Sequence, residues 1–283
     1  MKILILGSKG MLGQELSTQL SALKHEVEPF DIDDLDITDT TKMRETILYI
    51  KPDVIINAVA INAVDRIEDT PATYETAKKI NALAVGEMAK ICRAQNIILV
   101  HYSSDYVFPG TDKNGYDENA VPAPLNKYGE TKALGEKLLQ ENNDRYYLIR
   151  LSKLFGKPAV SSGAKKSFVD TIIGLAVGGK DQFDFVDDEM SAVTYAPDLA
   201  EFTIKLLQEK YPFGIYHGAN SGACTWYGWA KEIFALKNIK ADCTPVSMDK
   251  YPRPAQRPRF SQLLNTKLPP QRSWQVALRE YLL

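Results

Sequence analysis

Short apolar runs alternate with longer segments of helical periodicity through the first half of the chain. The apolar runs lie at residues 2–6, 26–30, 54–59, 97–101 and 146–151. Segments with apolar residues at helical spacing lie between them, at about 11–22, 40–50, 73–95 and 126–142. Strands covered on both faces read as continuous apolar runs, and the intervening helices are typical of βαβ crossovers. The pattern therefore predicts an α/β fold with a Rossmann-like, doubly wound parallel sheet.

The second half of the chain has a different rhythm. Glycine, proline and aromatic residues cluster at 155–158, 211–214 and 251–259. Helical segments are spaced irregularly between these clusters, near 167–177, 196–209, 225–236 and 273–282. Because binding residues are concentrated on loops, we expect a dinucleotide-binding domain at 1–151 and a smaller, mainly substrate-binding region at 152–283. We expect that region to be interleaved with the first sheet, so the border is approximate.

Composition and charge narrow the class of protein. The 283 residues are 45% hydrophobic and 25% charged, as in globular proteins. Lysine and arginine number 34 against 36 aspartate and glutamate residues, so no basic excess favours nucleic acid as a partner. The N-terminal apolar run ends at Gly7, too early for a signal peptide or for the ~20 apolar residues of a membrane span. The three cysteines lack CxxC spacing and the three histidines are scattered. We therefore expect a cytoplasmic protein with free thiols and no bound metal.

A glycine-rich segment directly follows the first predicted strand and opens the first predicted helix. In this segment Gly7 permits a tight turn, Gly10 lets the backbone approach a pyrophosphate, and Gly13 lets helix and strand pack closely. The helix N-terminus, at Met11 and Leu12, offers N–H groups and a partial positive charge to the phosphates. This context favours dinucleotide binding over a purely structural turn.

Asp31 lies at the end of the second apolar run, beyond the glycine-rich segment. A carboxylate at that position can accept hydrogen bonds from the ribose hydroxyls of adenosine and would repel a 2′-phosphate. Lys9, inside the glycine turn, could instead attract a 2′-phosphate. The alternative is that Asp31 is a solvated loop residue beside Asp33 and Asp34. The cofactor is therefore expected to be NADH or NADPH, with a slight preference for NADH.

A phenol and an ammonium group stand four residues apart at Tyr128 and Lys132, so a helix places them on one face. An adjacent ammonium group stabilises the phenolate of tyrosine and lowers its pKa. Ser104 ends the fourth apolar strand, at the edge where ligands of open α/β sheets bind. Its hydroxyl could hold a carbonyl oxygen while Tyr128 donates a proton to that oxygen. On its own, the tyrosine–lysine spacing is more typical of an ordinary helix surface; the glycine turn and the serine at a strand end favour the catalytic interpretation. His101, inside the same apolar run, is expected to be a hydrogen-bonded core residue rather than a base.

Together these motifs resemble the extended short-chain dehydrogenase/reductase superfamily and, more narrowly, the dTDP-4-dehydrorhamnose reductase family. The resemblance covers essentially the whole chain. It rests on the segments 7–13, 52–58, 63–65, 100–108, 124–132, 135–136 and 257–258, together with Ser261.

The resemblance implies the reduction of a nucleotide-linked 4-keto-6-deoxy sugar by NADH or NADPH, foremost dTDP-4-dehydrorhamnose to dTDP-L-rhamnose. It places the catalytic set on Ser104, Tyr128 and Lys132. It implies cofactor contacts at Gly7, Gly10, Met11, Leu12, Gly13, Asp31, Asp36, Ile37, Ala60, Ile61, Asn62, Tyr128 and Lys132. It implies substrate contacts at Val64, Ser104, Asp105, Tyr106, Tyr128, Lys153 and Arg257. The expected partner is a nucleotide sugar, with a homodimer as one candidate assembly and no membrane.

The chain departs from the family pattern on the substrate side. Lys153 stands where the family usually has a tryptophan platform for the sugar. A usual Asp-Gln-x-Gly-x-Pro-Thr stretch reads Asp-Glu-Met-Ser-Ala-Val-Thr at 188–194, and a usual Asn-Phe pair is Ser-Phe at 167–168. These departures indicate a related sugar of different polarity or a weakened activity.

Two other functional classes remain open at this point. The first is a non-catalytic regulatory subunit that keeps the dinucleotide site, because fold alone does not establish activity. The second is an epimerase or dehydratase that would retain NAD through its cycle. Arg253, Arg257 and Arg259 lie in a proline-rich loop and suit a diphosphate, although a solvated basic loop has the same composition.

Overall fold

The structure is a computed structural model that describes residues 1–161 and 166–283. Its centre is a parallel six-stranded sheet with the order β10-β5-β4-β3-β1-β2. The strands are β1 (Lys2–Leu6), β2 (Glu26–Phe30), β3 (Val54–Asn57), β4 (Ile98–Ser104), β5 (Tyr146–Leu151) and β10 (Gly214–His217). From β1 the chain moves outward to β2 and then returns to build the other half from β3, so the direction of winding reverses there. The predicted α/β class and doubly wound parallel sheet are confirmed.

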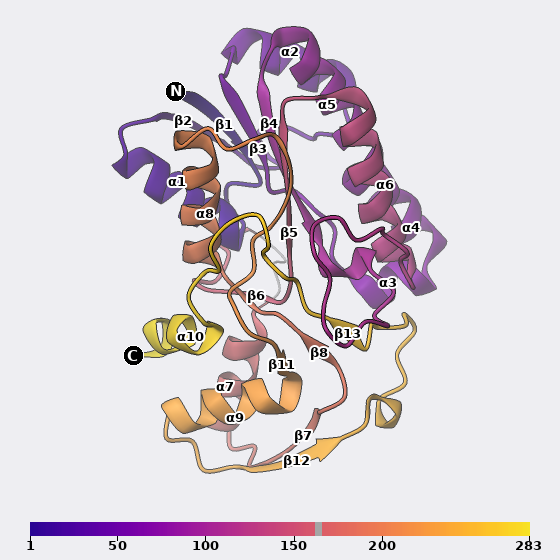
Figure 1. Ribbon diagram of the computed structural model, residues 1–283, viewed down its shortest axis with the longest axis vertical. Helices are drawn as coiled ribbons and strands as arrows, with labels where there is room; N and C mark the ends of the chain where they lie inside the picture. Colours follow the sequence, from indigo (N-terminus) through magenta and orange to yellow (C-terminus); the bar gives the residue numbers. More distant parts are fainter. Residues whose placement is uncertain (162–165) are drawn as a thin grey trace.

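Helices cover both faces of this sheet (Figure 1). One face carries α1 (Met11–Ala22) and α8 (Ala196–Gln208), and the other carries α2 (Thr40–Ile50), α5 (Ala84–Gln95) and α6 (Lys127–Asn142). Successive strand residues point to opposite faces. In β1, Ile3 and Ile5 therefore pack in the cluster with α1 and α8, while Leu4 and Leu6 pack in the cluster with α2 and α5. This double burial explains why the strands read as continuous apolar runs.

The crossover from β3 to β4 contains several shorter helices, where the sequence pattern predicted one long helix. Where one helix was expected at 73–95, the chain forms α4 (Pro71–Lys78), a π-helical turn at Lys79–Leu83, and α5. The short helix α3 (Val64–Asp69) precedes them. Pro71 stands at the start of α4, where its missing N–H is tolerated. The π-helical turn inserts the buried Asn81 between the two helices.

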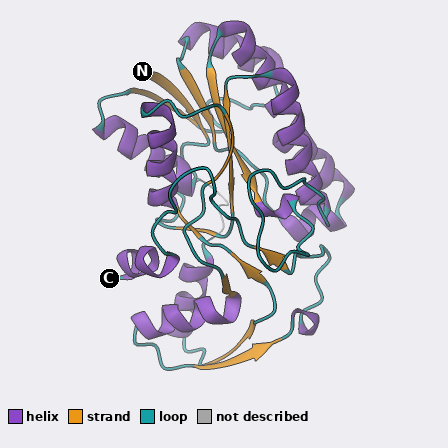
Figure 2. Ribbon diagram, viewed as in Figure 1, coloured by secondary structure: helices purple, strands orange, loops and turns teal. Residues whose placement is uncertain are grey.

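The chain after residue 151, apart from α8 and β10, forms a second, smaller layer below the sheet (Figures 1 and 2). Its apolar cluster is centred on Phe155, Trp229 and Trp274. Its helices are α7 (Phe168–Val177), α9 (Trp226–Leu236) and α10 (Trp274–Leu282), and its 3₁₀ turn is Met248–Lys250. Its strands are β6 (Leu154–Phe155), β7 (Gln182–Val186), β8 (Met190–Ser191), β9 (Thr194–Tyr195), β11 (Cys224–Thr225), β12 (Asp242–Val246) and β13 (Phe260–Ser261).

Residues on both sides of position 151 build the central sheet. β10 pairs in parallel with β5, and α8 lies against α1 on one face of the sheet. The division into two regions at that position remains a prediction. In residues 1–161 and 166–283, no helix combines the length and the apolar character needed to cross a membrane.

Candidate active site

The glycine-rich segment forms a tight turn between β1 and α1. Gly7 has a φ of 81°, in the left-handed region that favours glycine. The N–H groups of Gly7 and Ser8 donate to the Phe30 carbonyl at 2.9 and 3.0 Å, which ties the turn to the end of β2. A Cβ on Gly13 would lie 2.1 Å from the Gly7 carbonyl oxygen. The turn therefore requires glycine at both positions.

The start of α1 has the chemistry of an anion site. Gly10 is the N-cap, and within the described residues no side chain caps this helix and no acidic residue lies in its first turn. The first amides of a helix, here those of Met11, Leu12 and Gly13, have no partner within the helix. Uncompensated N–H groups and the positive end of the helix dipole fit the charge of a pyrophosphate. The donor set at this turn thus fits a dinucleotide.

Asp31 lies beside the glycine turn, as its place in the sequence predicted. One carboxylate oxygen accepts from the backbone N–H of Lys9 and the other from that of Ile32, both at 2.9 Å. The Lys9 ammonium group pairs with Asp33 at 2.7 Å. Asp36 and Ile37 follow on the same loop, and the Ile37 side chain is buried.

The loop after β3 is held by a residue that the sequence pattern did not single out. Asn81, in the π-helical turn, accepts from the Ile61 N–H at 2.9 Å and donates to the Ile61 carbonyl at 3.0 Å. Its amide also lies 3.0 Å from the Thr131 hydroxyl on α6. Ala60 and Asn62, the neighbours of Ile61, are exposed at the carboxyl edge of the sheet. The side-chain amide thus fixes this loop against the helix that carries Tyr128.

Ser104 and Tyr128 meet at the carboxyl edge of the sheet. Ser104 ends β4, and Tyr128 lies in the first turn of α6, whose N-cap Asn126 accepts from the Gly129 N–H at 2.9 Å. The Tyr128 ring is 9% exposed. Burial raises the pKa of Tyr128 to about 12, and a hydrogen bond with Ser104 opposes this rise. The phenol is therefore protonated at neutral pH, which is the state that a proton donor needs.

Lys132 lies on the same face of α6, one turn after Tyr128. Its Nζ donates to the Tyr102 carbonyl at 2.7 Å and lies 3.4 Å from Nε2 of His101. Burial lowers the pKa of Lys132 to about 8, and the Glu136 charge opposes this shift. The expectation that Lys132 lowers the pKa of Tyr128 stays a prediction.

Asp105 binds three parts of the chain together beside Ser104. Its carboxylate accepts from Ser104 at 3.2 Å, from Ser152 after β5 at 2.9 Å, and from Ser261 of β13 at 2.6 Å. Burial raises the pKa of Asp105, and these three hydrogen bonds oppose the rise. No sequence pattern pointed to Ser152, and Ser261 was named only among the residues that carry the family resemblance. Their contacts with Asp105 join residues that are far apart in the chain.

Aromatic and apolar side chains surround Tyr128. The Tyr106 ring meets the Tyr128 ring edge-on, with ring centroids 5.7 Å apart. Ile61 and Val64 pack into the same small cluster. Arg257 lies over the Tyr106 ring at 5.8 Å and pairs with Asp65 at 2.8 Å.

Arg257 is 9% exposed, so it is a buried wall of the site rather than part of a solvated loop. The other two arginines of the loop also meet carboxylates. Arg259 pairs with Asp188 at 2.9 Å, and Arg253 pairs with Glu189.

The backbone of Lys153 is strained, and among the described residues its side-chain Nζ lacks a hydrogen-bonding partner. It has a φ of 41° although it is not glycine, a conformation that is costly for a long side chain. Its Nζ is buried, has no hydrogen-bond partner among the described residues, and lies 3.9 Å from the centroid of the Trp226 ring. Burial lowers the pKa of Lys153 to about 8. Trp226 thus faces the one departure from the family pattern that introduces a cation.

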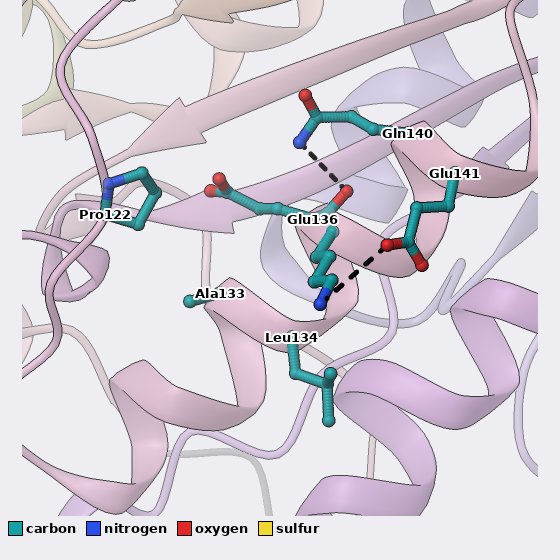
Figure 3. A pocket seen from close by; sticks show the side chains of 7 residues that line it. Pro122, Ala133, Leu134, Glu136, Gln140 and Glu141 are labelled. Carbon is teal, nitrogen blue, oxygen red and sulfur yellow. Dashed lines mark hydrogen bonds and ion pairs between the residues drawn. The ribbon is translucent and has the colours of Figure 1, made fainter.

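A surface pocket on α6 is separate from this constellation. It has a volume of about 540 Å³ and is lined by Pro122, Ala133, Leu134, Glu136, Lys137, Gln140 and Glu141. In Figure 3 the Gln140 amide points to the Glu136 carbonyl, to which it donates at 3.1 Å. Lys137 pairs with Glu141 at 3.8 Å. No proton donor and carbonyl-binding group converge there among the residues that line it.

Comparison with known proteins gives full-length matches. The family model described as RmlD substrate binding domain matches residues 1–283. The dTDP-4-dehydrorhamnose reductase of Escherichia coli is 33% identical and is aligned over 100% of this chain and 97% of its own. A crystal structure of a dTDP-4-dehydrorhamnose reductase from Clostridium acetobutylicum has a TM-score of 0.92 at 36% identity, covering 99% of this chain and 98% of that one. The same enzyme from Bacillus anthracis, in complex with NADP, has a TM-score of 0.92 at 32% identity with the same coverage.

Proposed function

The chain belongs to the RmlD substrate binding domain family, and from that premise we propose that it reduces a nucleotide-linked 4-keto-6-deoxy sugar with NADPH or NADH. The foremost substrate is dTDP-4-dehydrorhamnose, because full-length relatives bear the name of its reductase. The observation that carries the proposal is the buried pair of Ser104 and Tyr128 at the carboxyl edge of the sheet, with Lys132 one turn further along α6.

The cofactor-binding residues are proposed from the glycine turn outward. The amides of Met11, Leu12 and Gly13 would bind the pyrophosphate between Gly7 and Gly10. The adenosine would lie by Asp31, Asp36 and Ile37, and the nicotinamide end by Ala60, Ile61, Asn62, Tyr128 and Lys132. When bound, the reduced nicotinamide supplies a hydride. The sequence-based preference for NADH stays a prediction, and the relative from Bacillus anthracis holds NADP.

The chain's own part in the reaction is to bind the ketone and donate a proton. Ser104 donates a hydrogen bond to the ketone oxygen, and Tyr128 transfers its phenolic proton to that oxygen as negative charge develops. Lys132 in its ammonium form stabilises the phenolate that remains. Val64, Asp105, Tyr106, Lys153 and Arg257 complete the proposed wall around the sugar and its diphosphate. A homodimer remains a proposal, which sedimentation of the purified protein would test.

The first test supplies dTDP-4-dehydrorhamnose with each cofactor and follows the absorbance of the reduced nicotinamide. We expect oxidation of the cofactor that depends on the nucleotide sugar, with kcat/KM for NADPH and NADH compared at equal protein concentration. Binding of both ligands without turnover would instead support a regulatory dinucleotide-binding protein. Tightly retained NAD after purification would support an epimerase or dehydratase.

The sugar preference depends on Lys153. Among residues 1–161 and 166–283, the buried Nζ of Lys153 has no hydrogen-bond partner, so it favours a ligand that brings an acceptor. This supports, as the alternative substrate, a sugar more polar at this point than dTDP-4-dehydrorhamnose. We therefore expect Lys153→Trp to raise kcat/KM for dTDP-4-dehydrorhamnose by about tenfold or more, through removal of the ammonium and gain of an apolar contact. Steady-state kinetics with this substrate provides the measurement.

Lys153→Met is the matched control for this prediction, since it removes the charge and adds no ring. A gain in Lys153→Trp that exceeds the gain in Lys153→Met would assign the effect to the aromatic contact. Equal kcat/KM in the wild type and both variants would exclude this position as a determinant of sugar choice and leave the proposed reaction unaffected.

A further inference from the structure

Three buried polar side chains form a line behind Tyr128. Asn57 ends β3, His101 lies in β4, and Lys132 lies on α6; none of them is more than 1% exposed. Nδ2 of Asn57 is 3.2 Å from Nδ1 of His101, and Nε2 of His101 is 3.4 Å from Nζ of Lys132. Because water does not reach this line, each N–H must meet an acceptor within the protein.

The orientation of the Asn57 amide is fixed by the backbone. The Val59 N–H donates to Oδ1 of Asn57 at 3.1 Å. Rotating the amide by half a turn would place its NH₂ group against that N–H, donor against donor. The Asn57 NH₂ group therefore faces His101, and Nδ1 of His101 must accept its hydrogen bond.

This contact fixes the position of the single proton on His101. Burial holds the pKa of His101 well below its ordinary value, so the ring is neutral. A neutral imidazole has one N–H and one lone pair. Since Nδ1 provides the lone pair for Asn57, the N–H is on Nε2 and is directed at Lys132.

Lys132 then meets a donor where an ammonium group would need an acceptor. Its Nζ already donates to the Tyr102 carbonyl at 2.7 Å. An ammonium group has no lone pair, so the Nε2–H of His101 could not bond to it, whereas a neutral amine could accept that N–H. The contact between His101 and Lys132 is a hydrogen bond only when Lys132 is the amine.

A second buried histidine of the same chain shows the opposite arrangement. Nδ1 of His217 lies 2.9 Å from the Leu264 carbonyl, which can only accept, so His217 carries its proton on Nδ1. Its Nε2 lone pair then faces the Arg150 guanidinium at 3.5 Å. The Arg150 guanidinium thus faces a lone pair on Nε2 of His217. Lys132 instead faces the N–H on Nε2 of His101.

We propose that Asn57 and His101 are positioning residues that set the proton count of Lys132, by holding His101 in the Nε2–H tautomer that favours the amine. Two other titratable groups lie near this lysine on α6. Tyr128 is a neutral phenol. The Glu136 charge favours the ammonium form, but its carboxylate is held by Arg150 of β5 in a buried ion pair. Lys132 is thereby a group that gains and loses its proton near neutral pH rather than a permanent cation.

The pH dependence of activity that follows from this proposal rests on the proposed function. The Nε2–H tautomer of His101 does not depend on that function. The ammonium form of Lys132 is the one that stabilises the Tyr128 phenolate, so activity falls as pH rises through the Lys132 titration. Asn57 and His101 set the pH at which this fall begins. The tautomer and the lysine titration can be measured on the protein without substrate or cofactor, which separates this inference from the reductase assay.

The test is the ¹⁵N spectrum of protein labelled on its histidines, of which the chain has three. Ring nitrogens with and without a proton give well-separated signals, and single substitutions of His25 and His217 assign His101 by exclusion. We expect His101 to be protonated on Nε2 and His217 on Nδ1. His101 protonated on Nδ1, or on both nitrogens at neutral pH, would overturn the proposal.

Two variants of Asn57 then test the link to Lys132. Asn57→Asp keeps an acceptor for the Val59 N–H, but it accepts from Nδ1 of His101 and leaves Nε2 free to accept from Lys132. Asn57→Leu removes the Asn57 NH₂ group without adding charge. With lysine labelled at the ε-carbon, we expect the titration midpoint of Lys132 to rise by about one to three units in Asn57→Asp and by less in Asn57→Leu.

The basic limb of the pH profile for kcat should move in the same direction in both Asn57 variants. A rise in Asn57→Asp with no rise in Asn57→Leu would assign the shift to the added charge and overturn the role of the tautomer. An unchanged midpoint in both variants would do the same. Absence of turnover in the wild type would affect the proposed function and leave the tautomer result in place.

Discussion

Replacement of Tyr128 by phenylalanine is expected to lower kcat by about 10²- to 10⁴-fold, the usual contribution of a positioned general acid. The substitution removes only the hydroxyl oxygen, so the ring keeps its edge-on contact with Tyr106 and the start of α6 keeps its Asn126 cap. The ketone oxygen would then acquire negative charge beside Ser104 with no proton to receive. Single-turnover kinetics with reduced cofactor and saturating nucleotide sugar measures the loss.

Tyr147→Phe is the matched control. Tyr147 is a buried tyrosine of β5 whose hydroxyl donates to the Tyr211 carbonyl at 2.6 Å, away from the candidate site. Its substitution should cost about 1 kcal/mol of stability through the lost hydrogen bond and leave kcat unchanged. If Tyr128→Phe kept more than half of the wild-type kcat, the phenol would not be the proton donor.

Arg150→Met is expected to lower the free energy of unfolding by about 3–5 kcal/mol, as removal of one partner from a buried ion pair usually does. Arg150 donates to both oxygens of Glu136, at 2.9 and 2.7 Å, and each side chain is 1% exposed. The guanidinium also lies over the Phe108 ring at 4.9 Å. Without Arg150, the Glu136 carboxylate would stay buried with no positive partner. Urea unfolding followed by circular dichroism measures the difference.

The double variant Arg150→Met/Glu136→Leu distinguishes two causes of the lost stability: the loss of Arg150 packing and the burial of the unpaired Glu136 carboxylate. It removes the buried carboxylate together with its partner, so most of the lost stability should return. A double variant no more stable than Arg150→Met would contradict this explanation. Because Glu136 lies one turn beyond Lys132 on α6, the single variant should also disturb the helix that carries Tyr128.

The elements that position the site follow from local sequence signals. β1, β3, β4 and β5 are buried on both faces, so each reads as an apolar run. β2, at the edge of the sheet, is only partly buried. Gly7 and Gly13 stand where a strand, a turn and a helix follow one another within a few residues. The structure gives Gly7 a left-handed φ and places Gly13 in a contact that excludes a Cβ. Tyr128 and Lys132 share a helix face because their spacing matches the helical period.

Other features depend on contacts between distant parts of the chain, which no local pattern encodes. Asp105 meets Ser261 across 156 positions, and Lys153 meets Trp226 through the approach of α9. The π-helical turn that inserts Asn81 interrupts a segment whose apolar periodicity is continuous. His101 was expected to be a hydrogen-bonded core residue, and its contacts confirm this. Its link to Lys132 became visible only with the orientation of the Asn57 amide.

The central claim is that this chain catalyses hydride transfer to the carbonyl carbon of a nucleotide-linked sugar. It is tested most directly by incubating the protein with dTDP-4-dehydrorhamnose and NADPH carrying deuterium at the transferable position, then analysing the sugar product by mass spectrometry and NMR. The account predicts deuterium on the former carbonyl carbon, at a rate that falls sharply in Tyr128→Phe. A nucleotide sugar recovered without deuterium, although both ligands bind, would contradict it.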